Sequence, residues 1–195
     1  MIFGKTKFYK IWKNKLSTRF KRRRFRKIMQ AINVSGKLKI LDVGCSYGHD
    51  ALQFLNDGEK YSCWGVDIKP RIIDQDNVTF MQANARELPF EDKFFDIVIT
   101  IGLLEHIEPI EDLAQVISEL DRVGKHQLSV VPSVTTLIEP HTGKWRLPLR
   151  LHNRSSVRLN FLSEFTWTKF KGFGNCKVKR FYYIFPWMKN TLIYR

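Results

Sequence analysis

A short turn of small residues that follows an acid is the part of this chain best suited to hold a ligand. Asp42 is followed by Gly44, Ser46 and Gly48 at alternating positions in the stretch LDVGCSYGHD. Small residues let the backbone approach a ligand without a Cβ atom in the way. The stretch lacks both the glycine spacing of dinucleotide-binding loops and the Gly-Lys-Ser/Thr of triphosphate-binding loops. The turn therefore favours a ligand outside these two classes.

Two further polar residues come at the ends of apolar runs. Asp67 ends the run YSCWGVD, about twenty residues after the turn, where a carboxylate can accept hydrogen bonds from both ribose hydroxyls. Asn84 follows the next run, and its side-chain carbonyl oxygen is also an acceptor. Simpler interpretations, a helix cap for Asp67 and a turn residue for Asn84, stay open.

Two histidines are candidates for moving a proton. His106 comes just after the apolar run FFDIVITI, and His141 lies in a basic stretch further on. An imidazole can take up a proton near neutral pH, which makes both residues candidate general bases. The alternative is that each histidine only packs or lies at the surface.

Taken together, these residues occur in the order seen in the class I S-adenosylmethionine-dependent methyltransferases, with the small-molecule type of core. The chain resembles this family from about residue 38 to 132: ARELPF resembles the family's D-A-x-x-L-P-F, FFDIV its S-F-D-x-V, and LEHI its L-E-H-V. Ser46 departs from the family's glycine, a small-for-small change, and Asn84 replaces its acid.

The resemblance implies a function for each part of the site. The glycine turn would cradle the methionine part of S-adenosylmethionine, Asp67 would hold the ribose, and Asn84 would accept a hydrogen bond from the adenine amino group. No metal ion is required. The cofactor-binding residues expected from the resemblance are Asp42, Gly44, Cys45, Ser46, Gly48, Asp67, Ile68, Asn84, Ala85 and Ile101.

Positioning these residues requires strands that alternate with helices. Apolar runs predict strands over 37–44, 61–68, 77–84, 94–101 and 126–133, and a helical stretch over 103–124. A helix over 163–172 and strands over 176–185 and 191–195 follow. This order predicts an α/β, Rossmann-like, doubly wound and mostly parallel sheet, in which ligands bind beyond the carboxyl ends of the strands. The crossover over 69–77 is short for a helix.

Outside this core the chain is strongly basic. Residues 1–41 hold 14 Lys and Arg and no acid, residues 42–140 hold 7 basic and 18 acidic residues, and residues 141–195 hold 12 basic residues and one acid. We expect residues 1–34 to form a basic amphipathic helical extension and 35–195 the methyltransferase domain, with an irregular insertion over 135–160 that covers the substrate side. An anionic or lipid-linked substrate, a membrane surface or nucleic acid would suit these basic ends. Solvated charge is the alternative.

Two motifs that the sequence lacks narrow the possible classes of methyl acceptor. The position after the fourth strand reads IGLL, not the [DN]-P-P-[YF] of enzymes that methylate base amines, and no cysteine follows a proline. We therefore expect an enzyme, an O-methyltransferase for a small, glycan or lipid-linked acceptor near a membrane surface. Two alternatives stay open: an RNA methyltransferase, and a non-catalytic cofactor-binding protein that serves for interaction.

The lengths of the apolar runs and the spacing of the cysteines suggest where the protein is located. No apolar run approaches the roughly 18 residues that span a bilayer, and no secretory signal is apparent. The three cysteines are far apart, so we expect reduced thiols and no metal site. We predict a cytoplasmic protein that can lie at the inner face of the membrane. The sequence does not predict an oligomeric state.

Overall fold

The computed structural model describes residues 36–47, 60–70, 78–133, 164–184 and 188–195 of the chain. The extension predicted over 1–34, the insertion over 135–160, Gly48 and His141 lie outside the described residues. So does most of the short crossover between the second and third strands.

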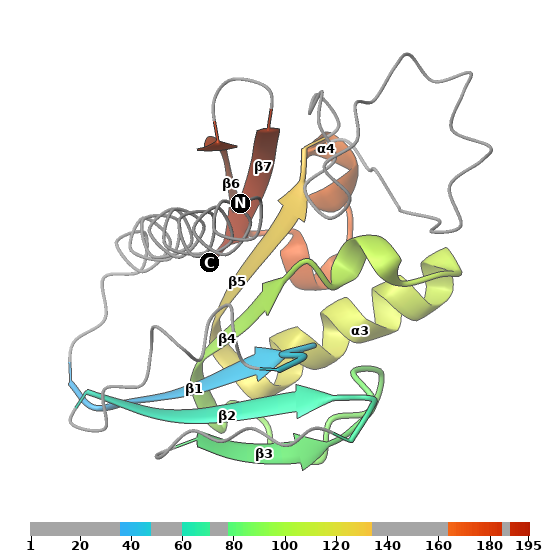
Figure 1. The fold of residues 1–195 in the computed structure, drawn as a ribbon. Helices are drawn as coiled ribbons and strands as arrows, with labels where there is room; N and C mark the ends of the chain where they lie inside the picture. Colours follow the sequence, from blue (N-terminus) through green and yellow to red (C-terminus); the bar gives the residue numbers. More distant parts are fainter. Residues whose placement is uncertain (1–35, 48–59, 71–77, 134–163, 185–187) are drawn as a thin grey trace, which may run out of the picture.

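A seven-stranded sheet forms the centre of the molecule, in the order β3-β2-β1-β4-β5-β7-β6 (Figure 1). The first five strands pair in parallel, and β7 runs antiparallel to both of its neighbours. The mostly parallel α/β sheet expected from the sequence is thereby confirmed. The strands are β1 (Leu38–Val43), β2 (Tyr61–Asp67), β3 (Val78–Gln82), β4 (Phe95–Ile101), β5 (Gly124–Pro132), β6 (Lys177–Ile184) and β7 (Met188–Tyr194).

The strand order determines where a ligand can bind. The chain moves outward from β1 to β2 and β3, then returns to the other side of β1 with β4 and β5. The order thus reverses between β1 and β4. In open parallel sheets, ligands bind beyond the carboxyl ends of the strands at this point of reversal, because the connecting loops separate there.

The helical stretch predicted over 103–124 is wrong as a continuous helix. A 3-10 turn, η1 (Leu104–His106), is followed by an extended segment, and the helix α3 (Ile110–Val123) begins only after Pro109. A proline disfavours helical backbone at the residue before it, so the helix begins on its far side. The helix ends as expected at Gly124, whose extended backbone opens β5 directly.

The helix predicted over 163–172 is also shorter than expected. It consists of α4 (Glu164–Trp167) and a 3-10 turn, η3 (Lys171–Phe173), separated by extended backbone at Phe170. The turn lies against α3: a Cβ atom on Gly172 would come within 2.7 Å of the Ile117 carbonyl oxygen. The break at Phe170 lets the chain make this close approach and bury the Phe173 ring.

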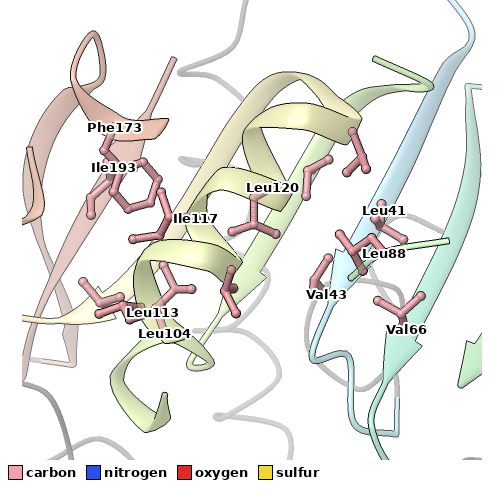
Figure 2. Close-up of a cluster of buried hydrophobic side chains, with 14 of the residues drawn as sticks. Leu41, Val43, Val66, Leu88, Leu104, Leu113, Ile117, Leu120, Phe173 and Ile193 are labelled. Carbon is pink, nitrogen blue, oxygen red and sulfur yellow. The ribbon is translucent and has the colours of Figure 1, made fainter. Parts of the chain in front are cut away.

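Helix α3 covers one face of the sheet. Five of its apolar residues follow helical spacing, so they form one stripe, and these five are buried. In Figure 2 this stripe lies between side chains of β1 and β2 and those of η3 and β7. The helix is therefore held by hydrophobic contact along its whole length, and its polar residues have fixed positions at the edge of the core. The buried stripe is Leu113, Val116, Ile117, Leu120 and Val123.

Candidate functional site

The loop after β1 turns sharply and is tied to the end of β2. Gly44 and Ser46 both have positive φ angles, of 75° and 52°. The amide N–H groups of Gly44 and Cys45 both donate to the Val66 carbonyl oxygen, at 2.8 and 3.1 Å. Serine rarely adopts this backbone, which explains why glycine is the family's residue at the position of Ser46. Ser46 nevertheless adopts this backbone, so the turn is kept although serine replaces glycine.

Gly44 also lies where the two halves of the sheet meet. A Cβ atom at this position would come within 2.9 Å of Leu103 Cδ1 and 3.2 Å of Leu103 Cβ. Leu103 follows β4, so the loops after β1 and β4 touch at the point where the strand order reverses. A side chain on Gly44 would push them apart.

Asp67 ends β2 and faces the same loop. Its Oδ2 accepts the amide N–H of Ser46 at 2.9 Å, and its Oδ1 accepts that of Lys69 at 3.0 Å. The side chain is only partly buried. A carboxylate has about four acceptor positions, and these two bonds orient the group relative to the loop after β1. The neighbouring side chains of Tyr47 and Ile68 are 55% and 64% exposed, which gives a ligand apolar surface beside the carboxylate.

Asn84 is held next to Asp67 by the backbone. The amide N–H of Ala83 donates to the Asp67 carbonyl oxygen at 3.1 Å. Asn84 then closes a tight turn, in which its Oδ1 accepts the Arg86 N–H at 3.0 Å and its carbonyl oxygen accepts the Glu87 N–H at 3.0 Å. Both the turn interpretation and a ligand contact are compatible with this geometry, because the exposed amide keeps a second lone pair on Oδ1 and two N–H donors.

Helix α3 holds the segment that follows Asn84. Arg122 donates to the carbonyl oxygens of Leu88 and Phe90, at 2.9 and 2.7 Å, and Glu119 accepts the Leu88 N–H at 2.8 Å. Glu119 and Arg122 are themselves joined by two hydrogen bonds of 2.7 and 2.8 Å. Neither residue was predicted from the sequence. Their acid-to-arginine spacing of three on one helix was the available signal.

The Glu119 carboxylate should make stability depend on acid. The hydrogen bond from Arg122 lowers the pKa of Glu119 below its ordinary value of 4.5, and the Leu88 N–H adds to this against the opposing effect of burial. A group whose pKa is lowered by folding stabilises the fold above its ordinary pKa and loses this effect as the pH falls through the lowered value. We expect Glu119→Gln to reduce the free energy of unfolding at pH 7, with the difference from the parent shrinking below pH 4.5. Urea titrations across this range measure it, and a difference that does not change with pH contradicts the assignment.

The other predicted residues are placed less directly. His106 is exposed in η1, just beyond β4, and its N–H donates to the Leu103 carbonyl oxygen at 2.9 Å. Asp42 and Cys45 are buried, at 3% and 5% exposure, and Ala85 and Ile101 are half-buried.

Cys63 in β2 and Asp96 in β4 have structural surroundings. Burial raises the pKa of Cys63 to about 12, and the charge of Asp42 adds to the effect, so this thiol stays protonated. Asp96, at the start of β4, accepts the Lys39 N–H at 2.9 Å and pairs with Lys125 at 2.8 Å. It lies at the amino end of β4, away from the loops after β1 and β4, and its contacts are structural.

No metal centre or membrane span is found in the described part of the chain. There, no three His, Cys, Asp or Glu residues gather as metal ligands would, and Cys45, Cys63 and Cys176 form no disulfide. No described helix is long and apolar enough to cross a bilayer.

Comparison with known proteins agrees with this geometry. Residues 41–128 match the family model of a methyltransferase domain. The chain carries a class I methyltransferase domain. The match runs from the end of β1 into β5 and so includes Gly44, Asp67 and Asn84. S-adenosylmethionine is the cofactor of this family.

Individual relatives support the domain assignment. An uncharacterised methyltransferase of Bacillus subtilis, YcgJ, is 31% identical over 97 residues, which cover 45% of this chain and 36% of that protein. The chain matches 34–40% of the length of the curated relatives, well under two thirds.

Solved structures extend the fold over more of the chain. A methyltransferase of Methanosarcina mazei aligns with a TM-score of 0.58 at 17% identity, over 83% of this chain and 92% of its own. Magnesium protoporphyrin IX methyltransferase from Synechocystis, solved with bound S-adenosylmethionine, aligns with a TM-score of 0.60 at 15% identity, over 91% and 77%. At these identities the likeness concerns the fold.

Proposed function

We propose that this chain is an S-adenosylmethionine-dependent methyltransferase that acts on a hydroxyl group of a small, glycan or lipid-linked acceptor near a membrane surface. The observation that carries the cofactor part is the Asp67 carboxylate, oriented by the Ser46 and Lys69 N–H groups beside a glycine turn. It fits the cofactor because the two oxygens of a carboxylate can accept hydrogen bonds from a pair of ribose hydroxyls. The close approach of Gly44 to Leu103 leaves no room for a side chain in the turn.

The work left to the protein is mainly alignment. When bound, S-adenosylmethionine supplies a methyl group that its sulfonium already activates for in-line displacement. Asp67 would hold the ribose, Asn84 the adenine, and the turn from Gly44 to Gly48 the methionine part. Fixing the donor in this way leaves the acceptor to approach from the end of β4, and holding two reactants in place removes a large entropic part of the barrier.

A hydroxyl acceptor also has to lose its proton. His106 is proposed as the base, since it is exposed directly after β4, next to the point where the two halves of the sheet meet. His141, in the basic insertion, is the second candidate. Either imidazole can accept a proton near neutral pH.

The class of methyl acceptor is proposed from the positive charge of the N-terminal residues. Residues 1–41 hold 14 basic and no acidic residues, with apolar residues at helical spacing, a composition suited to an anionic membrane surface. We expect the full chain to bind vesicles that contain phosphatidylglycerol, and the triple change Arg22→Glu, Arg23→Glu and Arg24→Glu to lower this binding at least about tenfold, since each surface cation contributes about 1 kcal/mol. Vesicle co-sedimentation measures it, with S-adenosylmethionine affinity as the control that should not change. Equal vesicle binding by both proteins contradicts the membrane assignment.

An RNA acceptor is the second candidate, favoured by one described feature. Lys169, Lys171, Lys177 and Lys179 are all exposed on the segment from α4 to β6, and cations of this density suit a phosphate backbone. Methyl-labelled S-adenosylmethionine, incubated with the full chain and with either a lipid extract or total RNA, separates the candidates. Label in the lipid fraction supports the leading proposal, and label confined to RNA overturns it.

A further inference from the structure

Helix α3 does more than cover the sheet, because its polar residues hold the segment that carries Asn84 in one conformation. We propose that Gln115, Glu119 and Arg122 are positioning residues that fix the orientation of the Asn84 side-chain amide and so make the site select adenine over hypoxanthine. The inference rests on the proposed function, since it assigns a specificity to the same cofactor site.

The first step is the orientation of the amide itself. An asparagine side chain presents an oxygen acceptor on one side and N–H donors on the other, so its rotation exchanges the two. In this protein the Arg86 backbone N–H, which can only donate, points at Asn84 Oδ1 at 3.0 Å. Rotating the amide would place two donors against each other. The turn therefore keeps the oxygen and the N–H groups of Asn84 on fixed sides.

The second step is what keeps the turn in place. Gln115 Nε2 donates to the Arg86 carbonyl oxygen at 3.0 Å, and the Arg86 guanidinium pairs with Asp112 at 2.7 Å. Two residues further on, Leu88 is held at both its N–H and its carbonyl oxygen, by Glu119 and Arg122. Every one of these contacts comes from α3, which is itself fixed by its buried apolar stripe.

The third step is the chemistry of the ligand. Adenine presents an amino donor beside the N1 acceptor, whereas hypoxanthine presents a carbonyl acceptor beside an N1–H donor. A freely rotating amide would bind either base by turning over. An amide with a fixed orientation matches only one of them and leaves a donor facing a donor with the other.

The test compares two ligands on four proteins. We expect the parent chain to bind S-adenosylhomocysteine about tenfold more tightly than S-inosylhomocysteine, in which a carbonyl replaces the adenine amino group. In Arg122→Met the ratio of the two affinities should fall to about two. Gln115→Ala, an exposed position that loses only its bond to Arg86, should lower the ratio in the same direction without a large effect on folding. Lys125→Met breaks the ion pair with Asp96 at the amino ends of β4 and β5. This variant should keep the affinity ratio of the parent.

Isothermal titration calorimetry of the four proteins with both ligands gives the ratios. A loss of folding lowers both affinities together, so it leaves the ratio unchanged. If Arg122→Met and Gln115→Ala weaken both ligands equally, α3 only stabilises the loop and the inference is wrong. If the parent chain binds neither ligand, the proposed cofactor site itself is overturned, a result distinct from the first.

Discussion

Asp67→Ala should lower the affinity of the chain for S-adenosylmethionine about a hundredfold. The Ser46 and Lys69 N–H groups hold this carboxylate at the end of β2, beside the loop after β1. A hydrogen bond to a charged group contributes about 1.5 to 3 kcal/mol, so losing two from the ribose costs at least about 3 kcal/mol. Isothermal titration calorimetry measures the change.

Two variants separate this effect from a disturbed loop. Asp67→Asn keeps an acceptor oxygen but not the charge, and should fall between the parent and Asp67→Ala, at about tenfold weaker binding. Asp96→Asn removes a carboxylate at the amino end of β4, where it accepts hydrogen bonds from the Lys39 N–H and from Lys125, and should leave the affinity unchanged. Binding by Asp67→Ala within about twofold of the parent would rule out the ribose contact.

Gly44→Ala should affect both stability and binding. The added Cβ would meet Leu103 at 2.9 Å, and the backbone φ of 75° is unfavourable for alanine. The left-handed backbone costs about 1 to 2 kcal/mol, and the overlap with Leu103 adds about 1 kcal/mol more. We also expect at least tenfold weaker binding of S-adenosylmethionine, because the loops after β1 and β4 must separate to relieve the contact.

Gly36 provides a matched control for this change. Its φ is 101°, also in the region that favours glycine, but a Cβ atom there would have no neighbour within 4 Å. Gly36→Ala should therefore lower the melting temperature through backbone strain alone and leave the cofactor affinity as it is. If Gly44→Ala and Gly36→Ala lower the melting temperature equally and neither alters binding, the proposed role of the Gly44 turn is wrong.

The sheet was predictable because its strands are local features. The strands are short apolar runs bounded by turn residues: Gly44 follows β1, and Gly124 begins β5. The observed bounds therefore differ from the predicted ones by only a few residues. The helix over 103–124 was placed less well. Its apolar spacing continues through η1, and the spacing alone did not predict that the helix would begin after Pro109.

The site was only partly predictable, for a related reason. Asp67 ends one strand and Asn84 follows its neighbour, and parallel pairing brings the carboxyl ends of these strands together, so pattern and spacing sufficed to predict that the two residues lie close to each other. The contacts from α3 to the loop after Asn84 join residues about thirty positions apart, Leu88 to Glu119 being 31. They depend on how deeply the helix packs on the sheet, which the order of residues does not reveal. The same applies to Gly44 and Leu103, whose contact depends on the loop conformations after two neighbouring strands.

A crystal structure of the full chain with S-adenosylhomocysteine is the most direct test of the proposed cofactor site. We expect the ribose hydroxyls within about 2.6 to 3.2 Å of the Asp67 carboxylate oxygens, the adenine amino group on Asn84 Oδ1, and the amino acid part against the turn that begins at Gly44. Ligand bound elsewhere on the chain, or a ribose whose hydroxyls lie out of reach of Asp67, would contradict it.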